Sequence, residues 1–202
     1  FAELGLKALR YPVLWERVDP QGRSTPDWTW SDQRLSRIRD LGLRPIAGLL
    51  HPRSGPSSTH LLDDGFAEAF AAYARAAAER YPWIGEWTPI NEPLTTARFS
   101  ALYGHLYPHA ADEPRFWAAL LNQIDATRWA MAEIRKVRPD ARLVQTEDLG
   151  RTYSTRAVAH QADFDNARRW MTWDLLEGRV APGHALWRRL EGFGFGDRLR
   201  AM

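Results

Sequence analysis

The chain has 202 residues, of which 45% are hydrophobic and 26% charged, so it can bury a sizeable core and is predicted to be one globular unit. No apolar run approaches the roughly 18 residues of a membrane helix, and the net charge of +2 comes from arginines that alternate with acids. Neither a membrane nor a nucleic-acid partner is therefore expected. The absence of cysteine excludes disulfides and thiolate metal sites. The chain begins with Phe1, so we expect the true N-terminus to lie elsewhere, and the absence of a leader from these residues says little about location. A cytoplasmic location is the expectation.

Short apolar runs alternate with amphipathic segments, a pattern typical of strand–helix units around a parallel sheet. The predicted strands are residues 9–15, 44–51, 84–90 and 141–146. The predicted helices are residues 31–41, about 64–81, 114–138 and about 163–177, after which the chain loosens into glycines. Ser31 is predicted to cap the first helix, and Asp63 with Asp64 favours the start of the second.

Two architectures fit such alternating units, an open doubly wound sheet and a (β/α)₈ barrel. A dinucleotide-binding open sheet would carry Gly-x-Gly-x-x-Gly after a strand, and no predicted strand is followed by it. The α/β class with a (β/α)₈ TIM barrel is therefore favoured. Because eight units take roughly 250 residues and four are visible, residues 1–202 are predicted to form a single, incomplete barrel domain. Pro12 fits the first strand only near its C-terminal tip.

Polar side chains follow the predicted strands at their carboxyl ends, where a barrel enzyme keeps its chemistry. They belong to residues 10–15, His51, Asn91 with Glu92, and Glu147 with Asp148. Pro93 ends sheet pairing, so Glu92 is expected to project from a strand tip beside Trp87. A carboxylic acid in a partly apolar, aromatic-lined site can protonate a leaving oxygen near neutral pH, as glycoside hydrolysis requires. Glu92 is the candidate for that role.

Each of these polar residues also has an ordinary interpretation. Asn91 and His51 could bind sugar hydroxyls, or they could belong to a surface loop and a strand cap. Glu147 is either a second carboxylate of the site or a turn residue. His105 and His109 have the spacing of a helical metal pair, but Tyr107-Pro108 lies between them and argues against a regular helix. No metal is expected, and a loop that lines the sugar site is favoured.

The segment Trp87-Thr-Pro-Ile-Asn-Glu-Pro93 resembles glycoside hydrolase family 1, the β-glucosidase-like enzymes of the retaining clan, whose fourth barrel strand ends in Asn-Glu-Pro. Arg10-Tyr-Pro-Val-Leu-Trp15, followed by Arg17, is similar to the family's second strand, and Pro45-Ile-Ala-Gly-Leu-Leu-His51 is similar to its third. The resemblance implies about strands 2 to 5 of the barrel with their helices.

The resemblance also implies roles for the polar residues. Glu92 would be the acid/base of retaining β-glycoside hydrolysis, Asn91 and His51 would hold the sugar, and Arg10 would lie near the nucleophile. Trp15 and Glu147 are further candidates for binding the carbohydrate substrate. No cofactor and no metal is implied.

Two segments depart from the family pattern and indicate an outlying bacterial subgroup. They are Pro52-Arg53-Ser54-Gly55-Pro56, where Trp-Asp-Leu-Pro is usual, and Gln145-Thr-Glu-Asp148. The family's nucleophile is a Glu near the end of strand seven, so we expect residues 1–202 alone to lack turnover and to be a marginal or associating fragment. The alternatives are another family of the same clan and a non-catalytic carbohydrate-binding or regulatory domain, with or without a fused sugar-nucleotide enzyme.

Overall fold

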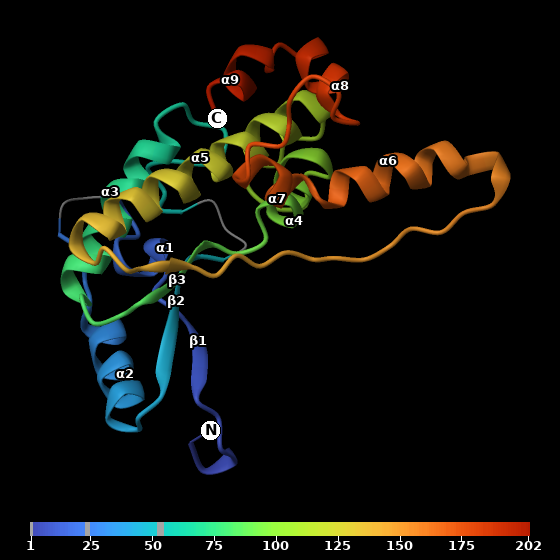
Figure 1. The fold of residues 1–202 in the computed structure, drawn as a ribbon. Helices are drawn as coiled ribbons and strands as arrows, with labels where there is room; N and C mark the ends of the chain where they lie inside the picture. Colours follow the sequence, from blue (N-terminus) through green and yellow to red (C-terminus); the bar gives the residue numbers. More distant parts are fainter. Residues whose placement is uncertain (1, 23–24, 52–54) are drawn as a thin grey trace.

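The computed structural model describes residues 2–22, 25–51 and 55–202. Four parallel strands form one sheet in chain order (Figure 1). They are β1 (Ala8–Pro12), β2 (Arg44–Leu50), β3 (Glu86–Ile90) and β4 (Arg142–Leu143). A strand order that equals the chain order, with a helix between successive strands, is the arrangement of repeated strand–helix units. The predicted parallel α/β sheet is therefore confirmed.

Helices cover one side of this sheet. Figure 1 shows α2, α3 and α5 together on that side, whereas α6 and the segment before it project from the body. The α-helices of the described residues are α1 (Trp15–Val18), α2 (Thr29–Asp40), α3 (Phe66–Arg80), α4 (Pro93–Ala97), α5 (Glu113–Val137), α6 (Ala159–Arg169), α7 (Met171–Leu176), α8 (Trp187–Gly192) and α9 (Gly196–Arg200). Three single turns are η1 (Ala2–Leu4), η2 (Arg98–Leu102) and η3 (Arg156–Val158).

All four strands are shorter than the sequence predicts: β2 ends at Leu50, β3 begins at Glu86, and β1 and β4 end early. Strand β1 ends at Pro12, which therefore lies at the C-terminal tip as expected, and the N–H of Val13 makes a last bond to Gly48 O. Strand β4 ends at Leu143, the N–H of Val144 makes a last backbone bond to Trp87 O, and side chains then replace the backbone ladder. The Thr88 hydroxyl donates to the carbonyl oxygen of Val144 at 2.7 Å. The predicted strands 9–15 and 141–146 were thus too long, because pairing passes from backbone to side-chain groups at both tips.

Helix starts also differ from the expectation. Helix α2 begins at Thr29, whose N–H is bound by the carboxylate of Asp27 at 2.9 Å, and Ser31 is a buried residue inside the helix. Ser31 is therefore not the cap. Asp63 organises the turn before α3, since its carboxylate accepts the N–H of His60 at 2.8 Å. The stretch predicted as residues 163–177 is two helices that meet at Trp170, and the glycine-containing end still forms α8 and α9.

Trp15 lies in an aromatic cluster between α1 and α3. Its ring stacks on Tyr73 with 5.7 Å between centroids and contacts Phe70 at 5.6 Å. The Tyr73 hydroxyl donates to Val13 O at 2.7 Å, and burial holds the pKa of Tyr73 well above its ordinary value, so this donor stays protonated. Trp15 is 5% exposed and is a core residue that ties the end of β1 to α3.

The carboxylate of Glu86 joins three strands at the N-terminal end of the sheet. Glu86 accepts hydrogen bonds from Arg44 at 2.9 Å and from Arg142 at 2.7 Å, so β2, β3 and β4 share one carboxylate. The Glu86 side chain is 10% exposed, and its Oε2 atom has no partner among the described residues. The two guanidinium groups, by contrast, are more than half exposed.

The turn between β3 and α4 has an unusual backbone. Glu92 adopts the left-handed conformation with φ 46° and ψ 65°, a region that costs a non-glycine residue on the order of 1–3 kcal/mol. Pro93 then suits the first position of α4, where no N–H is needed, and the N–H of Thr96 bonds Glu92 O at 2.8 Å. The chain thus turns sharply at the strand tip while α4 begins at once.

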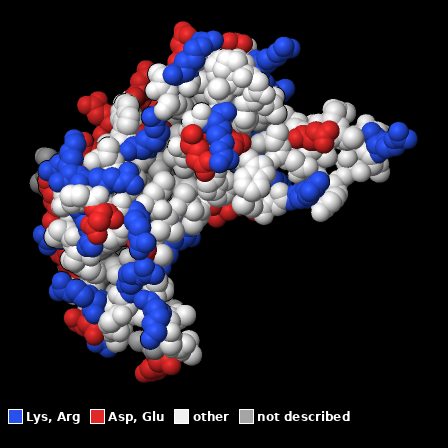
Figure 2. All heavy atoms as spheres, viewed as in Figure 1, with Lys and Arg blue, Asp and Glu red and all other residues white. Residues whose placement is uncertain are grey.

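Basic and acidic groups are interspersed over the face shown in Figure 2. The absence of a nucleic-acid partner stays a prediction. Among the described residues, no helix is both long enough and apolar enough to cross a membrane.

The N-cap of the long helix α5 gives a pH-dependent prediction. Asp112 accepts the N–H of Arg115 at 2.8 Å, and this hydrogen bond lowers the pKa of the Asp112 carboxyl in the folded protein. The cap therefore contributes its full stability above the pKa of the unfolded chain. That contribution is lost as the pH falls through the lower pKa of the folded state. We expect Asp112→Ala to reduce the free energy of unfolding by about 1 kcal/mol at pH 7 and by less below about pH 4. Urea unfolding at both pH values measures this, with Asp112→Asn as the control that keeps most of the cap.

The strain at Glu92 gives a second prediction. Glycine tolerates positive φ, so Glu92→Gly is expected to be about 1 kcal/mol more stable than Glu92→Ala in urea unfolding. At the exposed mid-helix position Gln33 in α2, the same pair of substitutions should have the opposite order, with glycine less stable by about 1 kcal/mol. The same order at both positions would contradict the left-handed backbone at residue 92.

Candidate active site

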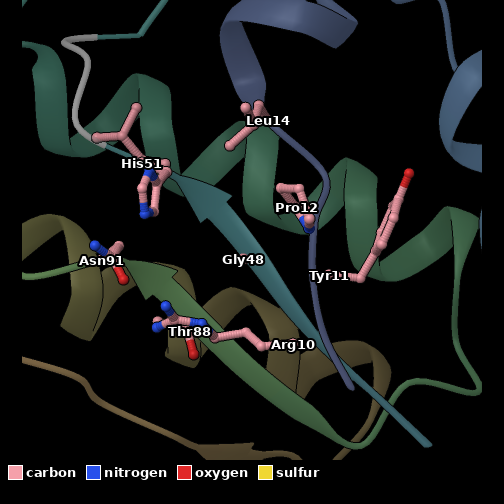
Figure 3. Close-up of a pocket in the computed structure, with 9 residues that line it drawn as sticks. Arg10, Tyr11, Pro12, Leu14, Gly48, His51, Thr88 and Asn91 are labelled. Atoms are coloured by element: carbon pink, nitrogen blue, oxygen red, sulfur yellow. The ribbon is translucent and has the colours of Figure 1, made fainter. Parts of the chain in front are cut away.

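A pocket of about 280 Å³ lies at the carboxyl ends of β1, β2 and β3 (Figure 3). Because the strands are parallel, residues that follow each strand meet at this edge of the sheet. The lining residues are Arg10, Tyr11, Pro12, Leu14, Gly48, Leu50, His51, Thr88 and Asn91. Three residues singled out in the sequence, Arg10, His51 and Asn91, are thus brought together here, and Figure 3 shows Tyr11 directed away from them.

A short hydrogen-bond chain orients Asn91. Arg10 Nη1 donates to the hydroxyl of Thr146 at 2.9 Å, and that hydroxyl donates to Asn91 Oδ1 at 3.1 Å. Because a guanidinium group can only donate, the single hydroxyl proton is left for Asn91. The Nδ2 group of Asn91 makes no hydrogen bond within the described residues, so it is available as a donor at the pocket. Asn91 itself is 6% exposed, and its N–H is bound to Leu50 O.

Thr88 and Thr146 were missed by the sequence reasoning. Thr88 lies two residues after Glu86 on the same face of β3, and Thr146 lies four residues after Arg142, which pairs with Glu86 in the register. The alternation of side chains along these strands could have identified both threonines, because it places them on the face of the sheet that also carries Arg10.

His51 directly follows β2 and is exposed at the pocket. No hydrogen bond within the described residues holds its ring, so either nitrogen can meet a ligand. Residues 52–54, the first part of the unusual segment Pro52–Pro56, lie outside the described residues.

Glu92 lies beside Asn91 and is half-buried, but it does not line the pocket itself. Its carboxylate makes no hydrogen bond or ion pair within the described residues. The N–H groups of the first turn of α4, which a residue at this position could cap, are bound by another carboxylate. None of the described residues therefore engages the acid group of Glu92, which lies at the mouth of the sheet.

Glu147 is the residue that binds those N–H groups. Its two oxygens accept hydrogen bonds from Leu94 N at 2.8 Å, Thr95 N at 3.2 Å, Asp148 N at 3.1 Å and the Thr172 hydroxyl at 2.7 Å. A carboxylate offers about four acceptor positions, so these donors occupy Glu147. Trp15, in the core cluster described above, does not line the pocket either. Neither placement supports the predicted substrate contacts of Glu147 and Trp15.

His105 and His109 lie in the loop after η2. The His109 ring bonds Gly104 O at 3.0 Å, and the His105 ring packs against Phe99 and Tyr103. Within the described ranges, no group of three or more His, Asp or Glu side chains is arranged to hold a metal ion.

Known proteins resemble this chain over most of its length. The family model "Glycosyl hydrolase family 1" matches residues 1–175. Beta-glucosidase 4 from Oryza sativa subsp. japonica is 31% identical over 119 residues, which are 53% of this chain and 24% of that protein. The 6-phospho-beta-glucosidase of Dickeya chrysanthemi is 25% identical over 156 residues, or 71% of this chain and 32% of that protein. The chain thus spans a quarter to a third of the length of these relatives.

Solved structures show the same fold. The family 1 β-glucosidase from Thermotoga maritima in complex with isofagomine lactam superposes with a TM-score of 0.82 at 18% identity, covering 98% of this chain and 48% of that one. The complex of a Thermotoga maritima beta-glucosidase with cyclophellitol gives a TM-score of 0.70 at 24% identity, covering 79% and 39%. These matches confirm the predicted incomplete (β/α)₈ barrel. With the family model matched over residues 1–175, the chain belongs to glycosyl hydrolase family 1.

Proposed function

We propose that the protein containing this chain is a retaining β-glycosidase in which Glu92 is the general acid/base. The observation that carries the proposal is the carboxylate of Glu92, which has no partner among the described residues and is presented by a left-handed turn at the tip of β3, directly beside the pocket residue Asn91. Strained backbone conformations are concentrated at functional sites, where the surrounding structure maintains them. Membership of glycosyl hydrolase family 1 supports the same role.

In this mechanism, Glu92 first gives its proton to the oxygen of the departing aglycone, while a second carboxylate attacks the anomeric carbon and forms a glycosyl-enzyme ester. Glu92, now ionised, then takes a proton from water, whose oxygen displaces the carboxylate and releases the sugar. The two carboxyl groups of such enzymes are about 5 Å apart. Since Glu147 is occupied by four donors and the chain spans under half of its relatives, we propose that a segment after Met202 supplies the nucleophile.

The pocket supplies the sugar contacts in this proposal. Asn91 Nδ2 and the His51 ring offer groups for sugar hydroxyls, and the Arg10 guanidinium places a positive charge where it stabilises the ionised nucleophile. The names of the relatives point to β-glucosides as the substrate class. A non-catalytic carbohydrate-binding domain is the alternative, because the same pocket could hold a sugar without a second carboxylate. A cytoplasmic location also stays a prediction.

The test uses the protein expressed from its complete reading frame. Glu92→Gln is expected to lower kcat/KM about 10²–10⁴-fold for phenyl β-glucoside, whose leaving group needs a proton. The loss should be much smaller for 2,4-dinitrophenyl β-glucoside, whose leaving group departs without protonation. Proton NMR of the first product should show the β-anomer, as retention requires.

Glu79→Gln on α3 is the matched control, since this exposed glutamate lies away from the pocket and should leave both rates unchanged. Equal losses on both substrates in Glu92→Gln would refute the acid/base role. Sugar binding to a wild-type protein that turns over neither substrate would favour the binding-domain alternative.

A further inference from the structure

The turn that carries Glu92 is held by three consecutive residues at the tip of β4. Gln145 Nε2 donates to Ile90 O at 3.0 Å, and the Thr146 hydroxyl donates to Asn91 Oδ1 at 3.1 Å. Glu147 completes the set through the N–H groups of Leu94 and Thr95, at 2.8 and 3.2 Å. These contacts bracket Glu92 on both sides in the sequence, although none of them touches its carboxylate.

Helix α4 does not cap itself. It has five residues, Pro93 has no N–H, and its N-cap residue Glu92 makes no side-chain cap hydrogen bond. The free N–H groups of Leu94 and Thr95 therefore need an acceptor from elsewhere, and a carboxylate suits the positive end of a helix. Glu147 is that acceptor, so the carboxylate of Glu92 is not needed to cap α4.

Glu147 is itself anchored from a third element. Thr172 in α7 is fully buried, and its hydroxyl donates to Glu147 Oε2 at 2.7 Å. Two further bonds fix the segment from α4 and α5: the Thr96 hydroxyl donates to Asn91 O at 3.2 Å, and Gln123 Nε2 donates to Pro93 O at 3.0 Å. The strained turn is thus over-determined by polar contacts, the condition under which such a backbone persists.

We infer that Glu147, with Thr172 behind it, is a positioning residue that holds the Glu92 turn in its left-handed conformation, and that it is not a second catalytic carboxylate. The inference rests on the proposed function of Glu92. To serve as nucleophile or to bind a sugar hydroxyl, Glu147 would have to give up one of four hydrogen bonds. Its removal instead releases the first turn of α4 and so misplaces Glu92.

The test compares leaving groups in the full-length protein. Displacement of a catalytic group by about 1 Å can cost about 100-fold in rate, so Glu147→Ala is expected to lower kcat/KM for phenyl β-glucoside about 10- to 100-fold. For 2,4-dinitrophenyl β-glucoside the loss should stay within about threefold, with KM nearly unchanged, because that step needs no proton from Glu92. Thr172→Val should reproduce the pattern more weakly, and Thr172→Ser should restore the wild-type rates.

Asp148→Ala is the matched control. It removes a neighbouring carboxylate whose side chain pairs with Arg169 at 3.6 Å and does not contact α4, so both substrates should keep their rates. Equal losses on both substrates in Glu147→Ala would overturn the inference and leave Glu147 a stabilising residue only. If Glu92→Gln itself fails to separate the two substrates, the proposed function fails instead.

Amide hydrogen exchange provides a readout that does not depend on turnover. Glu147→Ala should speed the exchange of the Leu94 and Thr95 amides at least about tenfold relative to wild type, while amides in the middle of α5 keep their protection. Glu147→Gln, which retains one carbonyl acceptor, should give an intermediate rate. Unchanged exchange at Leu94 and Thr95 would overturn the inference even in a protein without glycosidase activity.

Discussion

The contact between the tip of β4 and the turn after β3 is the constraint on which the candidate site depends. Backbone pairing between these strands ends with the bond from the N–H of Val144 to Trp87 O, and from there the polar side chains of residues 145–147 hold the neighbouring segment. A backbone ladder could only continue the strand direction. Side-chain hydrogen bonds also reach a chain that turns away, which is what allows Asn91 and Glu92 to project at the pocket.

The two glutamates at this edge show how surroundings separate identical side chains. Glu147 meets four donors and orders the protein around it, whereas Glu92 meets none within the described residues and remains available to a ligand. The backbone strain at Glu92 opposes stability, and the free carboxylate is the property that this strain supports. In the proposed mechanism, stability and reactivity would therefore be divided between neighbouring strands.

Sequence patterns predicted the parallel sheet, the sites of its four strands and the meeting of Arg10, His51 and Asn91, because periodicity and parallel topology decide these features. They could not predict that Glu147 and Glu92 differ, since both simply follow a strand and only the partners from α4 and α7 distinguish them. Trp15 was misplaced because the chain leaves the sheet after Pro12 and turns into α1. The prediction that Ser31 caps α2 was wrong because the carboxylate of Asp27, a residue type that caps helices as well as serine does, accepts the N–H of Thr29.

The carboxylate that Glu86 shares with Arg44 and Arg142 has a consequence for folding. Neighbouring positions along a strand point to opposite faces, so sliding any one of these strands by a single residue would carry its charged group under the helices. There the group would be buried without its partner, which is strongly unfavourable. This three-strand ion cluster therefore opposes misaligned pairing of β2, β3 and β4.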